Sequence, residues 1–437
     1  MKGEEGTRHE ARGARVEIRG ARVVDPASRR DEQASLFIAD GTIAAIGAAP
    51  DGFRADEVIE AKGLVACPGL VDISARLREP GFEYKATLGS ELRAAAAGGI
   101  TTVACPPDTD PPLDEPGLVE MLARRASSLD IVRVLPLGAL TVGLEGERLA
   151  EMVELREAGC VGFSQGNAPL PGTPTLLHAM RYAATFGYTI WLRPEDAALA
   201  EGGVAHEGEV ATRLGLAPIP AVAETIAVRA IVELMAATGA RVHLARLSTG
   251  AAVGLVAEAK ARGLPLTCDV GIHHLHLSDR DIGDFNSNCR FSPPLRDPSD
   301  RDRLRRAVAE GVIDAICSDH APVDEDAKQL PFGEAEPGAT ALELLLPLTL
   351  QWGSGCGLGL AQSLGAITHR AAAILGVRAG VLQAGASADV CLFDPKRGWV
   401  VQSSALLSQG KNTPFQGLEL TGRVVRTLVG GRTVHAS

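Results

Sequence analysis

Several features common in other protein classes are missing from this sequence of 437 residues. No apolar run approaches the ~18 residues of a membrane span, and the charged first residues lack the apolar core of a signal peptide. The 43 Lys and Arg residues are outnumbered by 54 Asp and Glu residues, and the resulting net charge of −11 disfavours binding to nucleic acid or to an anionic membrane. We therefore expect a cytoplasmic protein with no nucleic-acid and no membrane partner.

Two further absences concern motifs. The eight cysteines include no Cys-x-x-Cys pair. In a cytoplasmic chain of this length, scattered cysteines are expected to be small buried hydrophobic residues and not disulfides. No Gly-x-Gly-x-x-Gly opens a helix after any predicted strand, which disfavours a doubly wound nucleotide-binding sheet.

The middle of the chain alternates short apolar strands with Ala-, Leu-, Glu- and Arg-rich helical stretches, several of which end in glycine. Eight strands alternating with helices over about 300 residues is typical of an α/β protein built as a (β/α)₈ TIM barrel. We assign residues 67–375 to this barrel. The predicted strands are residues 69–74, 99–106, 132–140, 160–165, 189–196, 241–248, 265–274 and 315–319.

Both ends of the chain carry short strands separated by turn signals. Asp40-Gly41 and Gly430-Gly431 stand between alternating apolar runs, as hairpin turns do. We expect residues 14–66 and 376–437 to form one small composite β domain. Residues 1–13 are charged and without periodicity, so we expect a disordered tail there.

The catalytic residues of barrel enzymes lie at the carboxyl ends of the strands. The sequence motifs at those ends of this chain resemble those of a known family. The first strand runs into Asp72-Ile73-Ser74-Ala75-Arg76-Leu77-Arg78-Glu79-Pro80-Gly81. Further along stand GGITTVACPP (98–107), GGVAHEG (202–208), LSTGAAV (247–253) and SDHAP (318–322). Together these motifs resemble the dihydroorotases, which are cyclic amidohydrolases of the metal-dependent amidohydrolase superfamily.

The resemblance implies six metal positions, because those enzymes read Asp-x-His-x-His-x-Arg at the first strand end and place four more ligands on later strands. In this chain the six positions are Ser74, Arg76, Gln165, Arg193, Arg246 and Asp319. Zinc needs imidazole, carboxylate or thiolate donors, and arginine has no lone pair to offer. Only Asp319, the family's general base, keeps its family residue. We therefore predict no metal, no cofactor and no catalytic residue, with Asp319 as a vestigial base.

The positions that hold the anionic substrate in the family are altered as well. Arg78 of the LREPG loop remains. The two family asparagines correspond to Asp108 and Ser292, and the histidine that closes the Asp-His-Ala-Pro motif corresponds to Val323. Asp108 would repel an anion. The resemblance therefore implies vestigial substrate positions at these four residues.

The three arginines at former ligand positions, Arg76, Arg193 and Arg246, support three hypotheses. Their fixed positive charge replaces the metal and neutralises Asp319, with Glu195 or Asp196 joining. Alternatively, they result from drift after catalysis was lost. In the third hypothesis they form a pocket for an anionic effector, since an arginine cluster suits phosphate or carboxylate.

Several histidines, cysteines and an Asp-His pair near the strand ends offer other kinds of chemistry. His273, His274 and His276 lie on one apolar stretch and offer a relocated metal site, with His274 and His276 on one strand face. Cys105 and Cys317 stand near predicted strand ends, but neither has a neighbour that obviously lowers its pKa. Asp319 and His320 do not form a dyad if they lie on a strand, because sequence neighbours there face opposite ways.

Three segments point to one subfamily within the dihydroorotases: GLEGE (143–147), RAAAAGGITTVACPP (93–107) and SQGKNTPFQG (408–417). They are similar to those of the non-catalytic dihydroorotase-like subunits that some bacteria keep alongside aspartate carbamoyltransferase. That resemblance implies a structural role in pyrimidine biosynthesis and a hetero-oligomer with the catalytic chain of the transferase. The alternative is an active cyclic amidohydrolase of the dihydroorotase type with a rebuilt or metal-free site.

Overall fold

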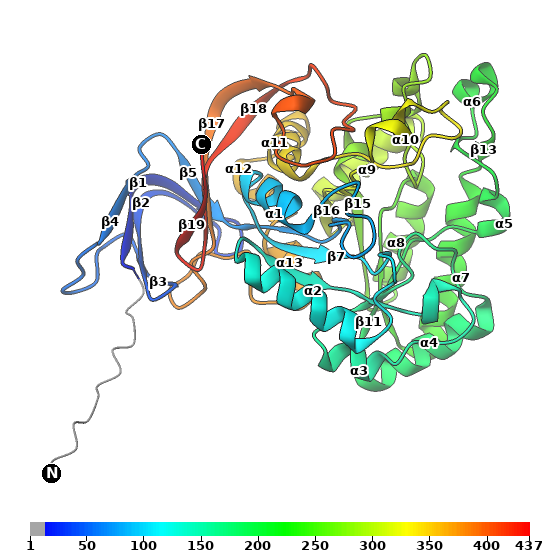
Figure 1. Cartoon of the computed structure of the whole chain (residues 1–437), viewed down its shortest axis with the longest axis horizontal. Helices are drawn as coiled ribbons and strands as arrows, with labels where there is room; N and C mark the ends of the chain where they lie inside the picture. The colour runs from blue at the N-terminus through cyan, green and yellow to red at the C-terminus, as the bar shows by residue number, and fades with distance from the viewer. Residues whose placement is uncertain (1–13) are drawn as a thin grey trace, which may run out of the picture.

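The computed structural model describes residues 14–437, so the tail expected at residues 1–13 lies outside the described residues. Figure 1 shows a β sheet on one side of the molecule and an α/β barrel on the other. The blue N-terminal strands and the red C-terminal strands lie side by side in that sheet. The composite β domain and the (β/α)₈ barrel of the predicted fold class are therefore both present.

The composite sheet has eight strands within residues 14–437, in the order β19-β18-β17-β5-β1-β2-β3, with β4 paired to β1. Both ends of the chain meet where β5 pairs with β17 in antiparallel register. The two expected hairpin turns are present: Asp40-Gly41 joins β2 to β3 and Gly430-Gly431 joins β18 to β19, all four residues with positive φ. The strands are β1 (Val16–Asp25), β2 (Arg30–Ala39), β3 (Thr42–Ile46), β4 (Glu57–Glu60), β5 (Val65–Pro68), β17 (Val390–Val400), β18 (Glu419–Val429) and β19 (Arg432–Ala436).

The barrel strands lie at all eight predicted places in the described chain. They are β6 (Leu70–Asp72), β7 (Ile100–Cys105), β8 (Arg133–Pro136) continued by β9 (Gly138–Ala139), β10 (Phe163–Ser164), β11 (Thr189–Leu192), β14 (Arg241–Leu244), β15 (Leu266–Gly271) and β16 (Ala315–Cys317). All neighbours in the barrel are parallel. A parallel bridge between Ala75 and His320 closes the barrel from the β6 side to the β16 side.

Helices cover the outside of the barrel, and their amphipathic faces pack on the strands. Glycines in the left-handed conformation end several of them, including Gly187 after α4 and Gly239 after α7. The helices are α1 (Leu88–Ala97), α2 (Pro116–Leu129), α3 (Met152–Glu157), α4 (Thr173–Phe186), α7 (Val222–Thr238), α8 (Gly250–Ala261), α9 (Pro298–Glu310), α11 (Leu345–Gly355), α12 (Leu360–Gly365) and α13 (His369–Leu375). None of the helices formed by residues 14–437 combines the length and hydropathy of a membrane-spanning segment.

Three predicted strands end three or four residues earlier than expected, and one of them, predicted at 241–248, stops at Leu244. The strand predicted at 189–196 stops at Leu192, because Pro194 has no N–H to donate to a sheet. The strand predicted at 265–274 stops at Gly271, and the 3₁₀ helix η2 (Ile272–Leu275) follows. The expectation that His274 and His276 share a strand face is therefore wrong.

Additional short elements sit in the loops at the carboxyl side of the barrel strands, and one further 3₁₀ helix, at residues 403–405, lies between β17 and β18. The connection from β11 to β14 contains several of these elements, including a small two-stranded sheet, β12-β13. The short elements are α5 (Ala197–Ala200), β12 (Ala205–His206), α6 (Glu209–Leu214), β13 (Pro218–Ile219), α10 (Glu325–Gln329), and the 3₁₀ helices η1 (Val142–Leu144), η3 (Asp279–Ile282), η4 (Ser287–Cys289), η5 (Leu342–Leu344) and η6 (Ser403–Ala405).

The inside of the barrel is filled by side chains and is not a channel. Val71, Ala104, Leu137, Trp191 and Cys317 pack together from five strands in one buried cluster. The expected role of the cysteines is confirmed: all eight are free, and Cys356 is the one among them that is partly exposed. The interior below the strand ends is therefore a packed core, which also contains the buried pair of His243 and Asp269 at 2.7 Å.

A buried carboxylate ties the barrel to the C-terminal segment. Glu91 on α1 lies 2.7 Å from His320 Nε2, and it accepts hydrogen bonds from Ser408 Oγ at 2.7 Å and Gln409 N at 3.0 Å. His320 Nδ1 accepts from the Ala341 N–H, so Nε2 carries the hydrogen that is donated to Glu91. Burial alone raises the pKa of Glu91, but these bonds outweigh burial and lower it.

We expect Glu91→Ala to lower the free energy of unfolding by ~3–5 kcal/mol, because the buried donors lose their common acceptor. Stability from a carboxylate whose pKa is lowered in the folded state is present above the unfolded value, ~4.3, and is lost as pH falls through the folded value. The loss should therefore be full at pH 7 and shrink below about pH 4. Urea unfolding at both pH values measures it, with exposed Glu120→Ala as the control. Equal loss for both variants would contradict this assignment.

Candidate functional site at the barrel mouth

The predicted pocket residues converge where the barrel strands end. Arg76 follows β6, Arg193 follows β11, Arg246 follows β14 and Asp319 follows β16. Because the strands are parallel, their carboxyl ends meet at one face, and chain positions up to 243 residues apart come into contact there. The side chains of these four residues are at most 9% exposed.

Asp319 is held by two arginines through the same oxygen. Arg246 Nη1 donates to Asp319 Oδ1 at 3.2 Å, and Arg76 Nη1 donates to it at 3.5 Å. The expected ion pairing of Asp319 with pocket arginines is thus present for two of the three. A base that must accept a proton from water is here occupied by two fixed cations.

Asp108 pairs with Arg76. Arg76 Nε donates to Asp108 Oδ2 at 2.9 Å. Burial raises the pKa of the Asp108 carboxyl, but the charges of Arg76, Arg246 and Arg78 outweigh burial and lower it. Asp108 therefore stays ionised in the pocket and balances part of its positive charge.

The third arginine uses different partners. Arg193 Nη1 forms an ion pair with Glu195, one of the two carboxylates expected there, while Asp196 caps α5 instead. Arg193 Nη2 donates to the Asn167 backbone oxygen at 3.1 Å, and Arg246 Nη2 donates to Asn167 Oδ1 at 2.7 Å. Asn167 thus joins two arginines, a role that nothing in the sequence indicated.

Three of the pocket residues have backbones in the left-handed region. The φ angles are 65° at Arg78, 59° at Arg246 and 45° at Asp319. Few non-glycine residues adopt such angles, and those that do concentrate at functional sites, where the surrounding structure holds them in place. The loops of this mouth therefore keep a backbone geometry that aims side chains inward.

The remaining metal positions do not face one another. Ser74 lines the small cavity described below. Gln165 turns away from the arginines: its Oε1 accepts from Thr141 Oγ1 at 3.0 Å and its Nε2 donates to the Leu144 carbonyl at 2.7 Å. Gln165 therefore serves the loop after β9 and not the pocket.

The vestigial substrate positions are also spread. Arg78 Nε donates to the Pro322 carbonyl at 2.9 Å. Ser292 meets Arg246 only through its backbone oxygen, at 3.2 Å. Val323 is buried and its N–H bonds Asn412 Oδ1. Two of the four positions therefore contact the arginines that hold Asp319. Asp108 contacts Arg76, and the backbone oxygen of Ser292 contacts Arg246.

The space left between these side chains is small. The cavity has a volume of about 20 Å³ and is lined by Ser74, Arg76, Arg193, Arg246 and neighbouring apolar atoms. Pockets for small organic ligands occupy about 300–1,000 Å³. A cyclic amide therefore cannot enter the mouth in this conformation.

The donor set does not fit the divalent cations that the fold family uses. Three of the six positions are protonated guanidinium groups, which repel a cation and offer it no lone pair. Gln165 is engaged elsewhere and Asp319 is taken by two arginines. We derive no chemical step through a metal here.

The relocated metal site fails on geometry. His273 stacks on Phe415, His274 Nε2 lies 3.2 Å from the Pro293 carbonyl, and His276 Nε2 lies 2.9 Å from the Leu348 carbonyl. The three imidazoles thus have separate partners. Burial lowers the pKa of His274 and of His276 to about 4, so both are neutral at pH 7.

The two cysteines near the strand ends are inert in this environment. Burial raises the pKa of Cys105 to about 12 and raises that of Cys317 as well. The thiolate, which is the nucleophile, is therefore suppressed at both. Asp319 and His320 face opposite ways, as expected: His320 points to Glu91 while Asp319 points to the arginines.

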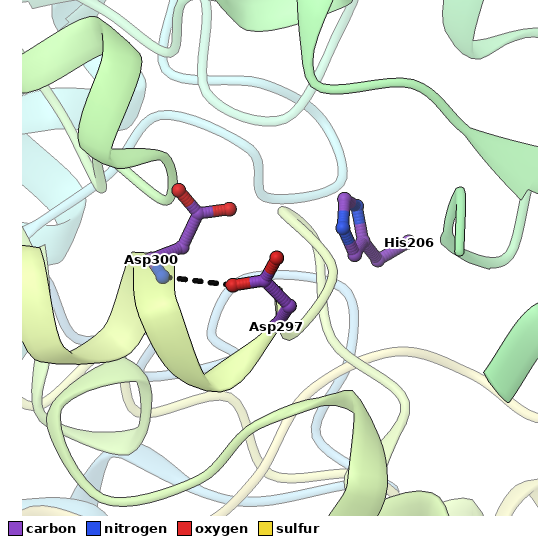
Figure 2. A group of neighbouring side chains, drawn as sticks. All are labelled: His206, Asp297 and Asp300. Carbon is purple, nitrogen blue, oxygen red and sulfur yellow. Dashed lines mark hydrogen bonds between the residues drawn. The ribbon is translucent and has the colours of Figure 1, made fainter. Parts of the chain in front are cut away.

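A cluster that the sequence did not indicate lies outside the mouth. His206, Asp297 and Asp300 gather within 4.8 Å (Figure 2). Asp297 caps α9 by accepting from the Asp300 N–H, and Asp300 accepts from the Gly250 N–H. Arg296 Nη1 faces His206 Nδ1 at 3.3 Å. Since arginine only donates, His206 Nε2 carries the hydrogen and cannot bind a metal.

Residues 63–251 match the family described as "Dihydro-orotase-like", and residues 176–434 match the "Amidohydrolase family". A "Dihydroorotase-like protein" of Pseudomonas aeruginosa is 46% identical over 413 residues, which covers 94% of this chain and 97% of that protein. The chain belongs to the dihydroorotase-like amidohydrolases. A protein of Geobacter sp. (strain M21) named "Dihydroorotase" is 41% identical over 94% of this chain and 97% of its own length.

Solved structures agree on the fold of this dihydroorotase-like chain. The L-hydantoinase (dihydropyrimidinase) of Arthrobacter aurescens has a TM-score of 0.86 at 26% identity, with 96% of each chain covered. The dihydropyrimidinase of Brevibacillus agri has a TM-score of 0.80 at 22% identity, covering 96% of this chain and 94% of its own. The barrel with its composite β domain is therefore a fold that this chain shares with both of these proteins.

We expect Asp319→Ala to lower the free energy of unfolding by ~3–5 kcal/mol, because two buried arginines lose their shared counter-charge. Arg76→Met combined with Asp319→Asn should cost less than the sum of the single changes, since each removes part of the same contact. Denaturant unfolding measures both effects. Asp302→Ala, at a half-exposed surface pair, is the control. An Asp319→Ala protein as stable as wild type would favour drift as the origin of the arginines.

Proposed function

We propose that this dihydroorotase-like protein is catalytically inactive and acts as a structural subunit of aspartate carbamoyltransferase in pyrimidine biosynthesis. The observation that carries the proposal is the double ion pair of Arg76 and Arg246 on Asp319. In the dihydroorotases that the chain resembles, this aspartate is the general base beside a metal. Here it is the counter-ion of two buried arginines.

The closed mouth supports the same proposal. A cavity of about 20 Å³ is an order of magnitude below the size of an organic ligand site. Opening it requires separating buried ion pairs, which typically costs several kcal/mol. In an inactive barrel, a stable interface with a partner protein would be the function that requires the folded structure.

A second candidate function is hydrolysis of a cyclic amide, as in an active dihydroorotase. It is favoured by the names of relatives that are 37–41% identical over most of this chain. For this function the mouth must open when the substrate binds, and Asp319 must be released from the arginines to transfer a proton. The arginine contacts of Asp319 count against it.

We expect no dihydroorotase turnover in either direction and no stoichiometric zinc, even after zinc is added. Restoring two ligands with Ser74→His and Arg76→His should not rescue activity, because Gln165, Arg193 and Arg246 still stand at three of the six metal positions. Assays of both directions and elemental analysis after purification without chelator measure this. Clear activity of the double variant, or one or two zinc ions per chain, would support the second candidate.

The proposed partner follows from the narrower family resemblance, and the surface offers a place for it. Tyr84, Phe285 and Leu330 are 65%, 49% and 45% exposed. They lie on loops that follow β6, β15 and β16, so all three belong to the carboxyl face of the barrel. Exposed aromatic and aliphatic residues on one face are typical of an interface core.

We expect a mixture of this protein and the catalytic chain of aspartate carbamoyltransferase to elute as one larger species in size-exclusion chromatography. Transferase activity should depend on that species. Tyr84→Glu with Leu330→Glu should weaken assembly at least tenfold, because charge is placed in an apolar interface. Phe186→Glu is the matched control: Phe186 is 51% exposed at the end of α4, on the opposite face. A transferase that is assembled and active alone, with no mixed species at micromolar concentrations, would refute the structural role.

A further inference from the structure

Helix α7, the longest helix in residues 14–437, is apolar on nearly every side. Most of its 17 residues are Ala, Val, Ile, Leu or Met. A helix that is hydrophobic all round is normally covered all round. The outer face of α7 is not covered within the described chain, because Val222 and Ile226 are 52% and 47% exposed there. Figure 1 shows the helix on the side of the barrel away from the composite sheet.

The short helix α5 extends this apolar face. Its N-cap residue, Asp196, donates its backbone N–H to the Ala223 carbonyl at 2.9 Å, so α5 is fixed beside the first turn of α7. Leu199 on α5 is 39% exposed. We call the outer side of these two helices the α7 surface, which consists of Leu199, Val222, Ile226, Arg229, Glu233 and Ala237.

A nearby helix shows how a water-exposed helix of this barrel is composed. Helix α8 packs on α7, and α9 packs on α8. After its first turn, the exposed residues of α9 are Arg303, Arg306 and Glu310, all of them charged. Exposed apolar side chains scattered singly are normal on a soluble protein, whereas exposed apolar side chains that cluster mark interaction sites. The α7 surface therefore has the composition of an interface and not of a solvated helix face.

The α7 surface carries two charged residues, and neither is paired within the described chain. Glu224, the third charged residue of α7, is turned inward, where it accepts from the N–H groups of Ser248 at 3.0 Å and Thr249 at 3.2 Å. Arg229 and Glu233 lie one turn apart on the outer side, and their side chains form no hydrogen bond or ion pair with any residue of 14–437. Their order contributes to this, since an acidic residue that precedes a basic one is the better arrangement for an ion pair along a helix. Both charges are therefore available to a group outside the chain.

We propose that the α7 surface binds the α7 surface of a second copy of this chain, with the two helices antiparallel about a two-fold axis at the level of Ile231. The exposed apolar residues of the two copies then cover one another. The inference goes beyond the structural-subunit role and does not depend on the transferase, since it concerns this chain alone.

The two charged residues of the α7 surface select this arrangement. Residues equally far before and after position 231 face each other across the two-fold axis. Arg229 of each copy thus faces Glu233 of the other, so both charges gain a partner. Ile226 of one copy comes next to Ala237 of the other, whose small side chain leaves room for it. In a parallel pair Arg229 would face Arg229 and Glu233 would face Glu233, which is unfavourable.

Sedimentation equilibrium of the full chain alone tests the proposal. We expect twice the mass of one chain at micromolar concentrations. Ile226→Glu should raise the dissociation constant of the pair at least tenfold, because it places carboxylates in the apolar part of the interface. Val58→Glu is the matched control, because Val58 is 42% exposed on β4 in the composite sheet. A chain that stays monomeric throughout the micromolar range, or a dimer that Ile226→Glu leaves intact, would overturn the proposal.

Reversal of the two charges tests the antiparallel arrangement by the same measurement. Arg229→Glu alone and Glu233→Arg alone should each raise the dissociation constant about tenfold, because charges of one sign then face each other. A mixture of these two variants should associate as tightly as the unmodified chain, since every acidic residue again faces a basic one. Arg306→Glu, at an exposed position of α9, is the control and should leave association unchanged. Single variants that associate normally, or a mixture that stays weak, would overturn the proposal.

Discussion

The contact on which the barrel mouth depends is the meeting of two guanidinium groups on one oxygen of Asp319. It joins the ends of β6, β14 and β16, which are far apart in sequence, and it fixes the side chains that line the remaining cavity. Neither arginine can be released without leaving a buried charge unpaired. The geometry of the mouth is therefore coupled: Asp108, Asn167 and the backbone of Ser292 are placed by the same two arginines.

The same coupling shows how guanidinium groups hold the strand ends of this mouth together. A binuclear site holds several strand ends together by placing positive charge among carboxylates and imidazoles. Guanidinium groups on the strands place positive charge at the same point, with the counter-charge of Asp319 retained. The backbones of Arg78, Arg246 and Asp319 are in the left-handed region at this mouth.

The barrel and its composite sheet could be predicted because short apolar strands and Gly-capped helices repeat along the chain. The pairing of Asp319 with arginines could be predicted too, since parallel strands bring their ends together. Contacts of a side chain that has several possible partners could not be predicted from the sequence. Gln165 was expected in the pocket but bonds Thr141 and Leu144, because a loop carbonyl and a hydroxyl lie within its reach. Asn167 carried no signal, since an amide in a loop has many possible partners. The cluster of His206 with Asp297 and Asp300 joins loops 91 residues apart and depends on how those loops fold back.

The sheet built from both chain ends has a consequence for synthesis of the protein. Strands β1 to β5 emerge from the ribosome first, but the outer edge of β5 is completed only by β17, near the end of the chain. Until then β5 presents unpaired N–H and C=O groups beside a finished part of a sheet, a surface that pairs readily with other extended chains. The entire barrel is made during that interval, at about 5–20 residues per second. The first domain of this protein to begin folding is thus the last to finish, and nascent chains on neighbouring ribosomes are at risk of pairing edge to edge.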